Sequence, residues 1–313
     1  MRVVFLIGES VELFDLAGPV QVFHEANALG AGYEIVFAGT ARSVASEQGV
    51  ALAELQRLPR AARGDLIVVP GSRLLREAGR RGTPDQPALV AWVKAAHAAG
   101  ATIASVCVGA FLLARAGLLD GRECTTHWKH VDELQRRFPK ARVLSDRLYV
   151  QDGPIVSSAG IASGVDMALA LVEAHAGPRV AATVAREMVV HVRRPGADAQ
   201  LNSFLDRRDH LDAAVHLVQD RIVNHPAERH TLDELAEIAR LSRRHLSRTF
   251  RAATGMTVGQ YHMRIRLEHA RTLLPNRRLT IEEVAQRCGL EDARHLRRAW
   301  KAAFGTSPGE GRR

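Results

Sequence analysis

The C-terminal third of the chain contains one pattern twice. The segment Thr231-Leu-Asp-Glu-Leu-Ala-Glu returns 49 residues later, from Thr280, as Thr-Ile-Glu-Glu-Val-Ala-Gln. The segment His245-Leu-Ser-Arg-Thr-Phe returns 50 residues later, from His295, as His-Leu-Arg-Arg-Ala-Trp. The extra residue falls in the turn between the two repeated segments, where a change of length leaves both helix faces intact. The repeat therefore predicts two copies of a helix-turn-helix unit.

Each copy carries the signals of two short helices in series. Both begin with a Ser/Thr-x-x-Glu capping box, Thr231 with Glu234 and Thr280 with Glu283, which satisfies free backbone amides at a helix start. Apolar residues follow at helical spacing and predict one buried stripe in each helix. The stripe residues are Leu232, Leu235 and Ala239 in the first copy, and Ile281, Val284 and Ala285 in the second.

The second helix of each copy has an arginine-rich face. Ser242 and Asp292 are the expected N-caps of these two helices. For one isolated run of arginine, a solvated helix face is the alternative, but two runs at one offset favour a DNA contact. Arginine binds guanine bidentately in the major groove or holds a phosphate. The predicted DNA-binding residues are Arg243, Arg244, Ser247 and Arg248, then Arg294, His295, Arg297 and Arg298.

From about residue 212 to residue 313 the sequence resembles the DNA-binding domain of the AraC/XylS family of transcription regulators. The matching segments are Ser242-Arg-Arg-His-Leu-Ser-Arg-Thr-Phe, Arg266-Leu-Glu-His-Ala-Arg-Thr-Leu-Leu, Ile281-Glu-Glu-Val-Ala and Phe304-Gly-Thr-Ser-Pro. The resemblance implies double-stranded DNA as a partner, with recognition helices in successive major grooves about 34–36 Å apart. It also implies a long joining helix, whose expected buried stripe is Met263, Leu267, Ala270 and Leu274.

Positive charge is concentrated on this same part of the chain. The net charge is +9, and from Asp209 onward 19 Lys and Arg stand against 13 Asp and Glu. A basic segment of this kind suits nucleic acid. A length of 313 residues suits two domains. We predict one domain over residues 1–192, a linker over 193–208 that contains a helix-breaking Pro-Gly pair, and a second domain over 209–313.

Cysteine spacing and hydropathy bear on metal binding, secretion and membrane insertion. Cys107, Cys124 and Cys288 make neither a disulfide framework nor a Cys-x-x-Cys zinc pair, so we expect no metal and no cofactor. The apolar run after Met1 is too short for a signal peptide. No apolar stretch approaches the ~18 residues of a membrane span. The sequence therefore predicts a cytoplasmic protein without a membrane partner.

The first two-thirds of the chain alternate short β-branched runs with helix-length segments. This pattern is typical of an α/β domain with a mostly parallel sheet, a flavodoxin-like sandwich, here followed by an all-α domain. Ligands bind such folds at the carboxyl ends of the strands. The expected strands are 3–7, 33–38, 66–69, 102–106, 149–150 and 155–158, and the expected helices lie near 20–29, 86–99, 108–116 and 164–174.

Cys107 stands at one of these strand ends. It follows Thr-Ile-Ala-Ser-Val and precedes Val108-Gly-Ala, which opens a helix. A helix N-terminus stabilises a thiolate, so this position predicts a lowered pKa for the Cys107 thiol. Buried packing of the cysteine is the alternative.

Residues 1–192 resemble the ThiJ/PfpI superfamily, which has the class I glutamine amidotransferase-like fold. The matching segments are Phe14-Asp-Leu-Ala-Gly-Pro, Val69-Pro-Gly, Cys107-Val-Gly-Ala-Phe-Leu-Leu-Ala, Ala116-Gly-Leu-Leu-Asp-Gly, Thr125-Thr-His-Trp and Ser158-Ala-Gly. The resemblance implies a ligand pocket in which an acidic residue approaches the cysteine. The implied pocket residues are Asp15, Gly71, Cys107, Val108, His127 and Gly160. Such a domain joined to an AraC unit is the arrangement of the GlxA-like regulators.

Two functions stay open on the sequence alone. The first is a transcription regulator whose N-terminal domain senses a small, nitrogen-containing metabolite and, as the resemblance implies, forms a homodimer. The second is a cysteine-dependent amidase or hydratase with a DNA-binding appendage, for which Asp15, Cys107 and His127 are the catalytic candidates. Asp15 could instead cap a helix that begins near Ala17, and His127 could be an ordinary polar residue. Val108 offers no hydroxyl beside the cysteine, which favours the sensor.

Overall fold

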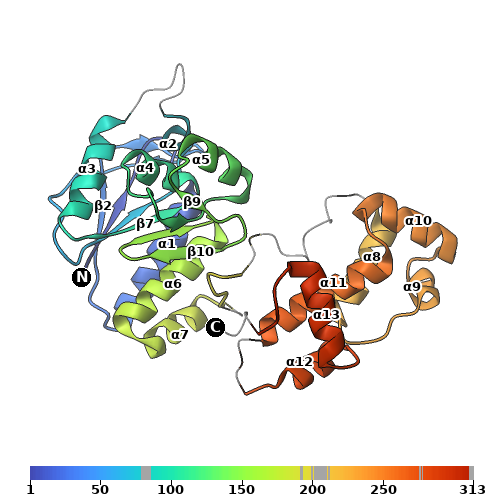
Figure 1. The fold of residues 1–313 in the computed structure, drawn as a ribbon. Helices are drawn as coiled ribbons and strands as arrows, with labels where there is room; N and C mark the ends of the chain where they lie inside the picture. Colours follow the sequence, from blue (N-terminus) through green and yellow to red (C-terminus); the bar gives the residue numbers. More distant parts are fainter. Residues whose placement is uncertain are drawn as a thin grey trace. The chain divides into compact units, whose positions relative to one another are not determined.

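The computed structural model describes residues 1–78, 86–190, 193–198, 200, 210, 212–274, 276 and 278–309. They divide into two compact units, taken from Met1–Gln200 and Leu201–Arg313 (Figure 1). The first is an α/β unit and the second is helical, which confirms the predicted fold classes. The 193–208 linker stays a prediction: residues 193–198 and 200 belong to the first unit, and 201–208 lie outside the described residues.

Among the described residues, seven strands form the central sheet of the first unit, in the order β10-β11-β7-β6-β1-β2-β5. Every neighbouring pair is parallel except β10 with β11, so the predicted mostly parallel sheet is confirmed. The strands are β1 (Arg2–Leu6), β2 (Glu34–Gly39), β5 (Gln56–Arg57), β6 (Leu66–Val69), β7 (Thr102–Val106), β10 (Tyr149–Asp152) and β11 (Ile155–Ser158). Every residue of β6 is buried, as expected for a central strand covered on both faces.

Helices cover both faces of this sheet (Figure 1). One core cluster joins the sheet to α1 (Leu13–Ala28), α6 (Ala162–Ala176) and α7 (Pro178–Glu187). The other joins it to α2 (Arg73–Glu77), α3 (Pro87–Ala98), α4 (Ala110–Arg115) and α5 (Val131–Arg137). The smaller elements are β3 (Val44–Ala45) with β4 (Ala51–Leu52), β8 (Glu123–Cys124) with β9 (Arg142–Val143), and the 3-10 helices η1 (Cys107–Gly109) and η2 (Trp128–His130).

The second unit contains the predicted repeat. Its helices are α8 (Ala213–Asn224), α9 (Leu232–Ile238), α10 (Arg243–Thr254), α11 (Val258–Leu273), α12 (Ile281–Arg287) and α13 (Ala293–Phe304). Both predicted capping boxes are present, at α9 and at α12. Ser242 and Asp292 cap α10 and α13 as predicted. Both of these helices end at a left-handed glycine, Gly255 and Gly305, each with φ of 72°.

Two separate hydrophobic clusters support the two copies, and α11 takes part in both. Tyr261 and Ile265 of α11 pack into the first cluster. Leu267 and Ala270 of α11 pack into the second, together with Leu274. These three confirm the predicted stripe, whereas Met263 is only partly buried. The joining helix therefore carries both helix-turn-helix units on one rigid element.

No helix in the described part of the chain is long and apolar enough to cross a membrane.

Candidate nucleic-acid interface and ligand pocket

The two recognition helices present arginine on one side and bury apolar residues on the other. Leu246 and Phe250 of α10 and Leu296 and Trp300 of α13 are buried. Six of the predicted DNA-binding side chains are exposed and have no ion pair within the described residues. They are Arg244, Ser247, Arg248, Arg294, Arg297 and Arg298. This arrangement leaves both cationic faces open to a polyanion.

Two predicted DNA-binding residues have partners inside the second unit. Arg243 is exposed and donates from Nε to Asp233 of α9. His295 is half-buried, with its Nδ1 3.9 Å from Oε2 of Glu291. Because neighbouring carboxylates already face these two side chains, Arg243 and His295 are less free to meet DNA than the six exposed residues above.

A carboxylate from the first helix of each copy contacts the first residue of the second helix. In the first copy Asp233 accepts from the side chain of Arg243. In the second copy Glu282 holds the place of Asp233, and its Oε2 accepts from the backbone N–H of Ala293 at 3.0 Å. The two contacts use different donors but join corresponding positions of the two copies.

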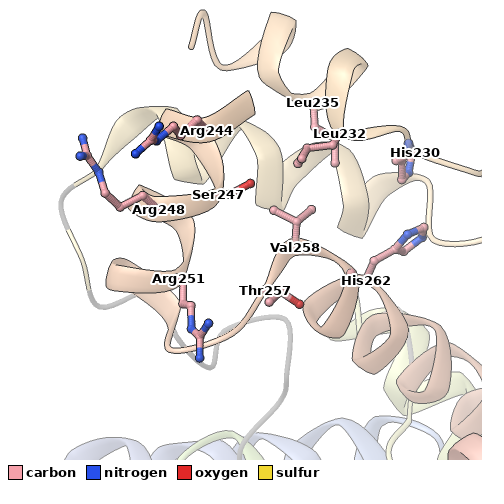
Figure 2. A pocket seen from close by; sticks show the side chains of 11 residues that line it. His230, Leu232, Leu235, Arg244, Ser247, Arg248, Arg251, Thr257, Val258 and His262 are labelled. Atoms are coloured by element: carbon pink, nitrogen blue, oxygen red, sulfur yellow. The ribbon is translucent and has the colours of Figure 1, made fainter. Parts of the chain in front are cut away.

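A cleft of about 580 Å³ lies beside α10 (Figure 2). Arg244, Arg248 and Arg251 line it from α10, and the start of α11 lines it at Thr257 and Val258. The remaining lining residues are His230, Leu232, Leu235, Ser247, Gly259 and His262. None of these described lining residues is acidic, so the cleft suits an anion. Arg251 was not predicted from the sequence, although Lys301 repeats its positive charge 50 residues later.

Two histidines of this cleft face each other, with ring centroids of His230 and His262 4.9 Å apart. Nε2 of His262 donates to the carbonyl of Pro226 at 2.9 Å. Burial lowers the pKa of His262 to about 4, and the hydrogen bond to Pro226 opposes this only in part. Because the His262 imidazole is neutral near pH 7, it adds no charge to the three arginines of the cleft.

The second candidate site lies where four neighbouring parallel strands of the first unit end. Asp15 lies on the helix that follows β1, and Gly71, Cys107 and Gly160 follow β6, β7 and β11. The order β11-β7-β6-β1 brings these strand ends together at one edge of the sheet.

Both glycines of this site are required by close contacts. A Cβ on Gly160 would overlap Cys107 and come within 2.9 Å of its Sγ, and the φ of Gly160 is +100°. A Cβ on Gly71 would overlap the Asp15 carboxylate and lie 3.2 Å from Cβ of Cys107. Only glycine fits at these two positions, because the backbone there passes close to the side chains of Cys107 and Asp15.

Cys107 lies on a sharp turn between β7 and η1, with φ of +55°. The prediction of a lowered thiol pKa is wrong. Burial raises the pKa of Cys107 well above its ordinary value, and the nearby charge of Asp15 raises it further. The helix after the turn, α4, has only six residues, and its positive end does not offset these two effects. The thiol is therefore protonated at neutral pH.

Asp15 is fully buried, and its Oδ1 accepts from the backbone N–H of Ile161 at 2.6 Å. The alternative that Asp15 caps a helix beginning near Ala17 is wrong, because α1 begins at Leu13 and its N-cap is Glu12. Burial raises the pKa of Asp15 to about 6, although the hydrogen bond from Ile161 lowers it. Asp15 and Cys107 thus form a buried acidic pair, in which the Asp15 carboxyl is mostly ionised at neutral pH and the Cys107 thiol is protonated.

The raised pKa of Asp15 predicts a pH-dependent stability of the first unit. Since the folded pKa of about 6 exceeds the ordinary value, the folded state binds more protons between about pH 4 and pH 6. Stability therefore falls as the pH rises through this window. Asp15→Asn keeps an acceptor for Ile161 without the charge, so we expect this variant to be more stable at pH 7.5 by on the order of 1–2 kcal/mol.

Urea unfolding, followed through hydrogen exchange of the β7 amides, measures this effect at pH 4 and pH 7.5. The wild type is expected to lose stability between these pH values relative to Asp15→Asn. If Asp15→Asn is less stable than the wild type by the same amount at both pH values, burial does not raise the pKa of Asp15, and the prediction is wrong.

His127 lies in a cavity of about 170 Å³ beside this acidic pair. Its Nδ1 accepts from the N–H of Lys129 at 3.3 Å, and burial lowers its pKa. The cavity lining consists of His127, Trp128, Leu148, Ala159, Gly160, Ile161, Ala162, Ser163, Arg194 and Gln200. Val108, in contrast, is buried in the core. Within the described residues no hydrogen bond joins His127 to Asp15 or Cys107, so the three catalytic candidates form no triad.

Comparisons with known proteins agree with both halves of this description. Residues 1–174 match the DJ-1/PfpI family and residues 235–313 match a helix-turn-helix domain. The HTH-type transcriptional regulator CdhR of Pseudomonas aeruginosa is 33% identical over 251 residues, which are 80% of this chain and 72% of that protein. The HTH-type transcriptional regulator GlxA of Rhizobium meliloti is 34% identical over 219 residues, or 68% and 66% of the two chains.

A solved structure of an AraC family transcriptional regulator from Pseudomonas putida superimposes with a TM-score of 0.52 at 25% identity. The match covers 60% of this chain and 98% of that one.

Proposed function

The chain belongs to the DJ-1/PfpI family and is a transcriptional regulator with a helix-turn-helix DNA-binding domain, and from this premise we propose how its two units act. We propose that α10 and α13 bind successive major grooves of a promoter and that the first unit senses a small metabolite. One observation carries the proposal: two capped helices at corresponding places of a repeat both expose arginines that have no ion pair within the described residues. Selection of bound duplexes from random-sequence DNA tests it, and a shared motif with two half-sites is expected.

The exposed arginines are proposed to divide into base readers and phosphate contacts. Arg244 and Arg294 occupy corresponding places near the starts of the two recognition helices, which is the part of such a helix that reaches base edges. The further proposed contacts are Ser247, Arg248, Arg297 and Arg298. Arg243 and His295 remain proposed DNA-binding residues at the helix starts, where Arg243 pairs with Asp233 and His295 lies near Glu291.

Arg251 is proposed to hold a DNA phosphate in the cleft beside α10. It lies one turn after Arg248 and lines the same cleft as Arg244. We expect Arg251→Ala to weaken binding by the same factor on operator and unrelated duplexes, and to reduce the salt slope by about one unit, because phosphate contacts carry no sequence information. Fluorescence anisotropy at several salt concentrations measures both quantities.

The matched control for this experiment is Arg186→Ala, an exposed arginine of α7 in the first unit. It removes one positive charge from the same protein and is expected to leave the salt slope unchanged. If Arg251→Ala weakens operator binding alone, Arg251 reads sequence, and its assignment to a phosphate is wrong.

The effector is proposed to be a small, nitrogen-containing metabolite bound at the strand ends of the first unit. The cavity of about 170 Å³ beside the buried Asp15–Cys107 pair limits its size. Oε1 of Gln200, a lining residue, is buried and accepts no hydrogen bond within the described residues, so an N–H donor would satisfy it. A thermal-shift screen of amino acids, betaines and polyamines tests this, because a specific ligand raises the melting temperature by mass action.

The amidase or hydratase alternative is not favoured, because the two relatives described above are regulators and the cysteine is poorly suited to attack. A raised pKa keeps the Cys107 thiol protonated at neutral pH, and the thiolate is the nucleophilic form. Assays with amide, isonitrile and α-oxoaldehyde substrates are therefore expected to show no turnover that Cys107→Ser abolishes. In this proposal Gly160 and His127 line the cavity, and Asp15, Gly71 and Cys107 pack next to Gly160 and support its position rather than react.

A homodimer through the first unit and a cytoplasmic location complete the proposal. Two protomers would place four helix-turn-helix units on one operator, and their separation would follow from the dimer geometry. Sedimentation velocity of the full chain measures the oligomeric state.

A further inference from the structure

The chain that leads from the first unit toward the second forms one wall of the proposed effector cavity. We call residues 193–198 and 200 the connector segment. Arg194 and Gln200 of this segment line the cavity opposite residues of the strand ends such as Gly160. The backbone N–H of Leu148 donates to the carbonyls of Gly196 and Asp198, both at 2.9 Å. The connector segment is therefore docked against the first unit rather than extended away from it.

Arg194 anchors the start of the connector segment. Its Nη2 and Nε donate to Oδ2 of Asp166 at 2.6 and 3.0 Å, and its backbone N–H donates to Oδ1 at 3.1 Å. The Asp166 side chain is only 4% exposed. Undocking would remove all three of these hydrogen bonds from the Asp166 carboxylate, which favours the docked state. The Arg194–Asp166 pair thus determines where the connector segment packs on the first unit.

Gln200 links the end of the connector segment to the cysteine turn. Its Nε2 donates to Oγ1 of Thr125 at 3.0 Å and to the carbonyl of Thr126 at 2.9 Å. Oγ1 of Thr126 in turn donates to the carbonyl of Cys107 at 2.8 Å. Because Thr126 offers a carbonyl, the amide nitrogen of Gln200 must face it, which leaves Oε1 as the buried atom without a donor.

The unsatisfied Oε1 makes docking at Gln200 weaker than docking at Arg194. A buried acceptor without a hydrogen-bond donor destabilises the state that buries it. A ligand in the cavity that contacts Arg194 or Gln200 makes those contacts only when the connector segment is docked. Such a ligand must shift the equilibrium toward the docked state. Gln200 is also the last residue of the first unit, so its position sets where the chain departs toward the DNA-binding unit.

We propose that the connector segment is a movable wall of the effector cavity and that its docking couples effector binding to DNA binding. This inference rests on the proposed function. Thermodynamic linkage makes this coupling reciprocal. If effector binding changes DNA affinity through docking, then binding of operator DNA must change the docking equilibrium as well.

Hydrogen exchange of the full chain with and without a selected operator duplex tests the coupling. The amides of Leu148 and Arg194 report docking, because both donate across the contact. Operator DNA is expected to change their exchange rates by about fivefold or more, the lower bound of a typical coupling energy. Unchanged rates at saturating operator would overturn the proposal.

Two variants loosen the connector segment by different routes. Gln200→Ala removes both amide hydrogen bonds, and Asp166→Asn weakens the Arg194 anchor. Each is expected to speed exchange at Leu148 and to change operator affinity by about fivefold or more. The control is Gln151→Ala, an exposed glutamine of β10, which is expected to change neither quantity. Slow hydrogen exchange of the β7 amides shows that the first unit stays folded. If exchange of these amides becomes fast in Asp166→Asn, the test relies on Gln200→Ala alone.

Faster exchange at Leu148 with unchanged operator affinity would mean that docking is uncoupled from DNA, and the proposal would fall. The proposed function fails in a different way: the wild-type chain would then select no motif from random-sequence DNA, whatever the state of its connector segment.

Discussion

Loss of both Arg244 and Arg294 is expected to weaken operator binding by about 2–6 kcal/mol, since each bidentate contact to guanine is worth about 1–3 kcal/mol. The two residues lie at the same place in separate copies of the repeat, and both are exposed and unpaired within the described residues. The two effects are expected to add, because residues that share no partners usually behave independently. Sequence discrimination should be lost at two separate positions of the operator.

Single and double alanine variants, measured by fluorescence anisotropy on operators with one base pair changed, test this prediction. Arg244→Lys is the matched control: lysine keeps the charge but lacks the planar fork that binds guanine, so the salt slope should stay while discrimination falls. If the alanine variants instead weaken binding equally on every sequence, with a salt slope flatter by about one unit per residue, these arginines hold phosphates.

Phe250→Ala is expected to destabilise the first helix-turn-helix unit by about 3–5 kcal/mol, the usual cost of removing a buried aromatic ring. Phe250 is fully buried and packs edge-on against Tyr261, with ring centroids 5.5 Å apart. Trp300 belongs to the other hydrophobic cluster, so the second unit should keep its packing. The variant is expected to lose operator binding through α10 while α13 remains folded.

Hydrogen exchange separates the two outcomes, because the amides of α9 and α10 report the first unit and those of α12 and α13 report the second. Leu217→Ala, on α8, is the control, since this leucine side chain is 50% exposed and its removal should cost little. Equal loss of protection in both units would contradict the prediction. It would show that α11, which packs into both clusters, makes them one cooperative body.

Features set by neighbours a few residues apart were predictable. The capping boxes at Thr231 and Thr280 each join residues three apart, and the structure confirms both. The buried strand β6 was predicted with its correct bounds, because a run of four β-branched or leucine residues stopped by Pro70 is a local signal. The start of α1 was placed too late, because Glu12 makes no side-chain cap and leaves no mark in the sequence.

The chemistry of the pocket was less predictable. The turn at Cys107 is a local feature and was expected, but the direction of its pKa shift was wrong, because desolvation depends on what the fold packs around the sulfur. Arg251 was also missed as a cleft residue. The cleft forms only where α10 and the start of α11 meet, and the sequence does not show that meeting.

The repeat, the helix starts within it and the parallel α/β unit were predictable from the sequence alone, because propensity, capping and hydrophobic periodicity act over a few residues. The two families were indicated by the resemblance of particular motifs. Only the tertiary structure decided the pocket. Its contacts join Asp15 to Ile161, 146 residues apart, and Gln200 to Thr125, 75 residues apart. The physical reason is that burial and hydrogen-bond satisfaction belong to the assembled neighbourhood of a side chain, and no local pattern records which distant segments will surround it.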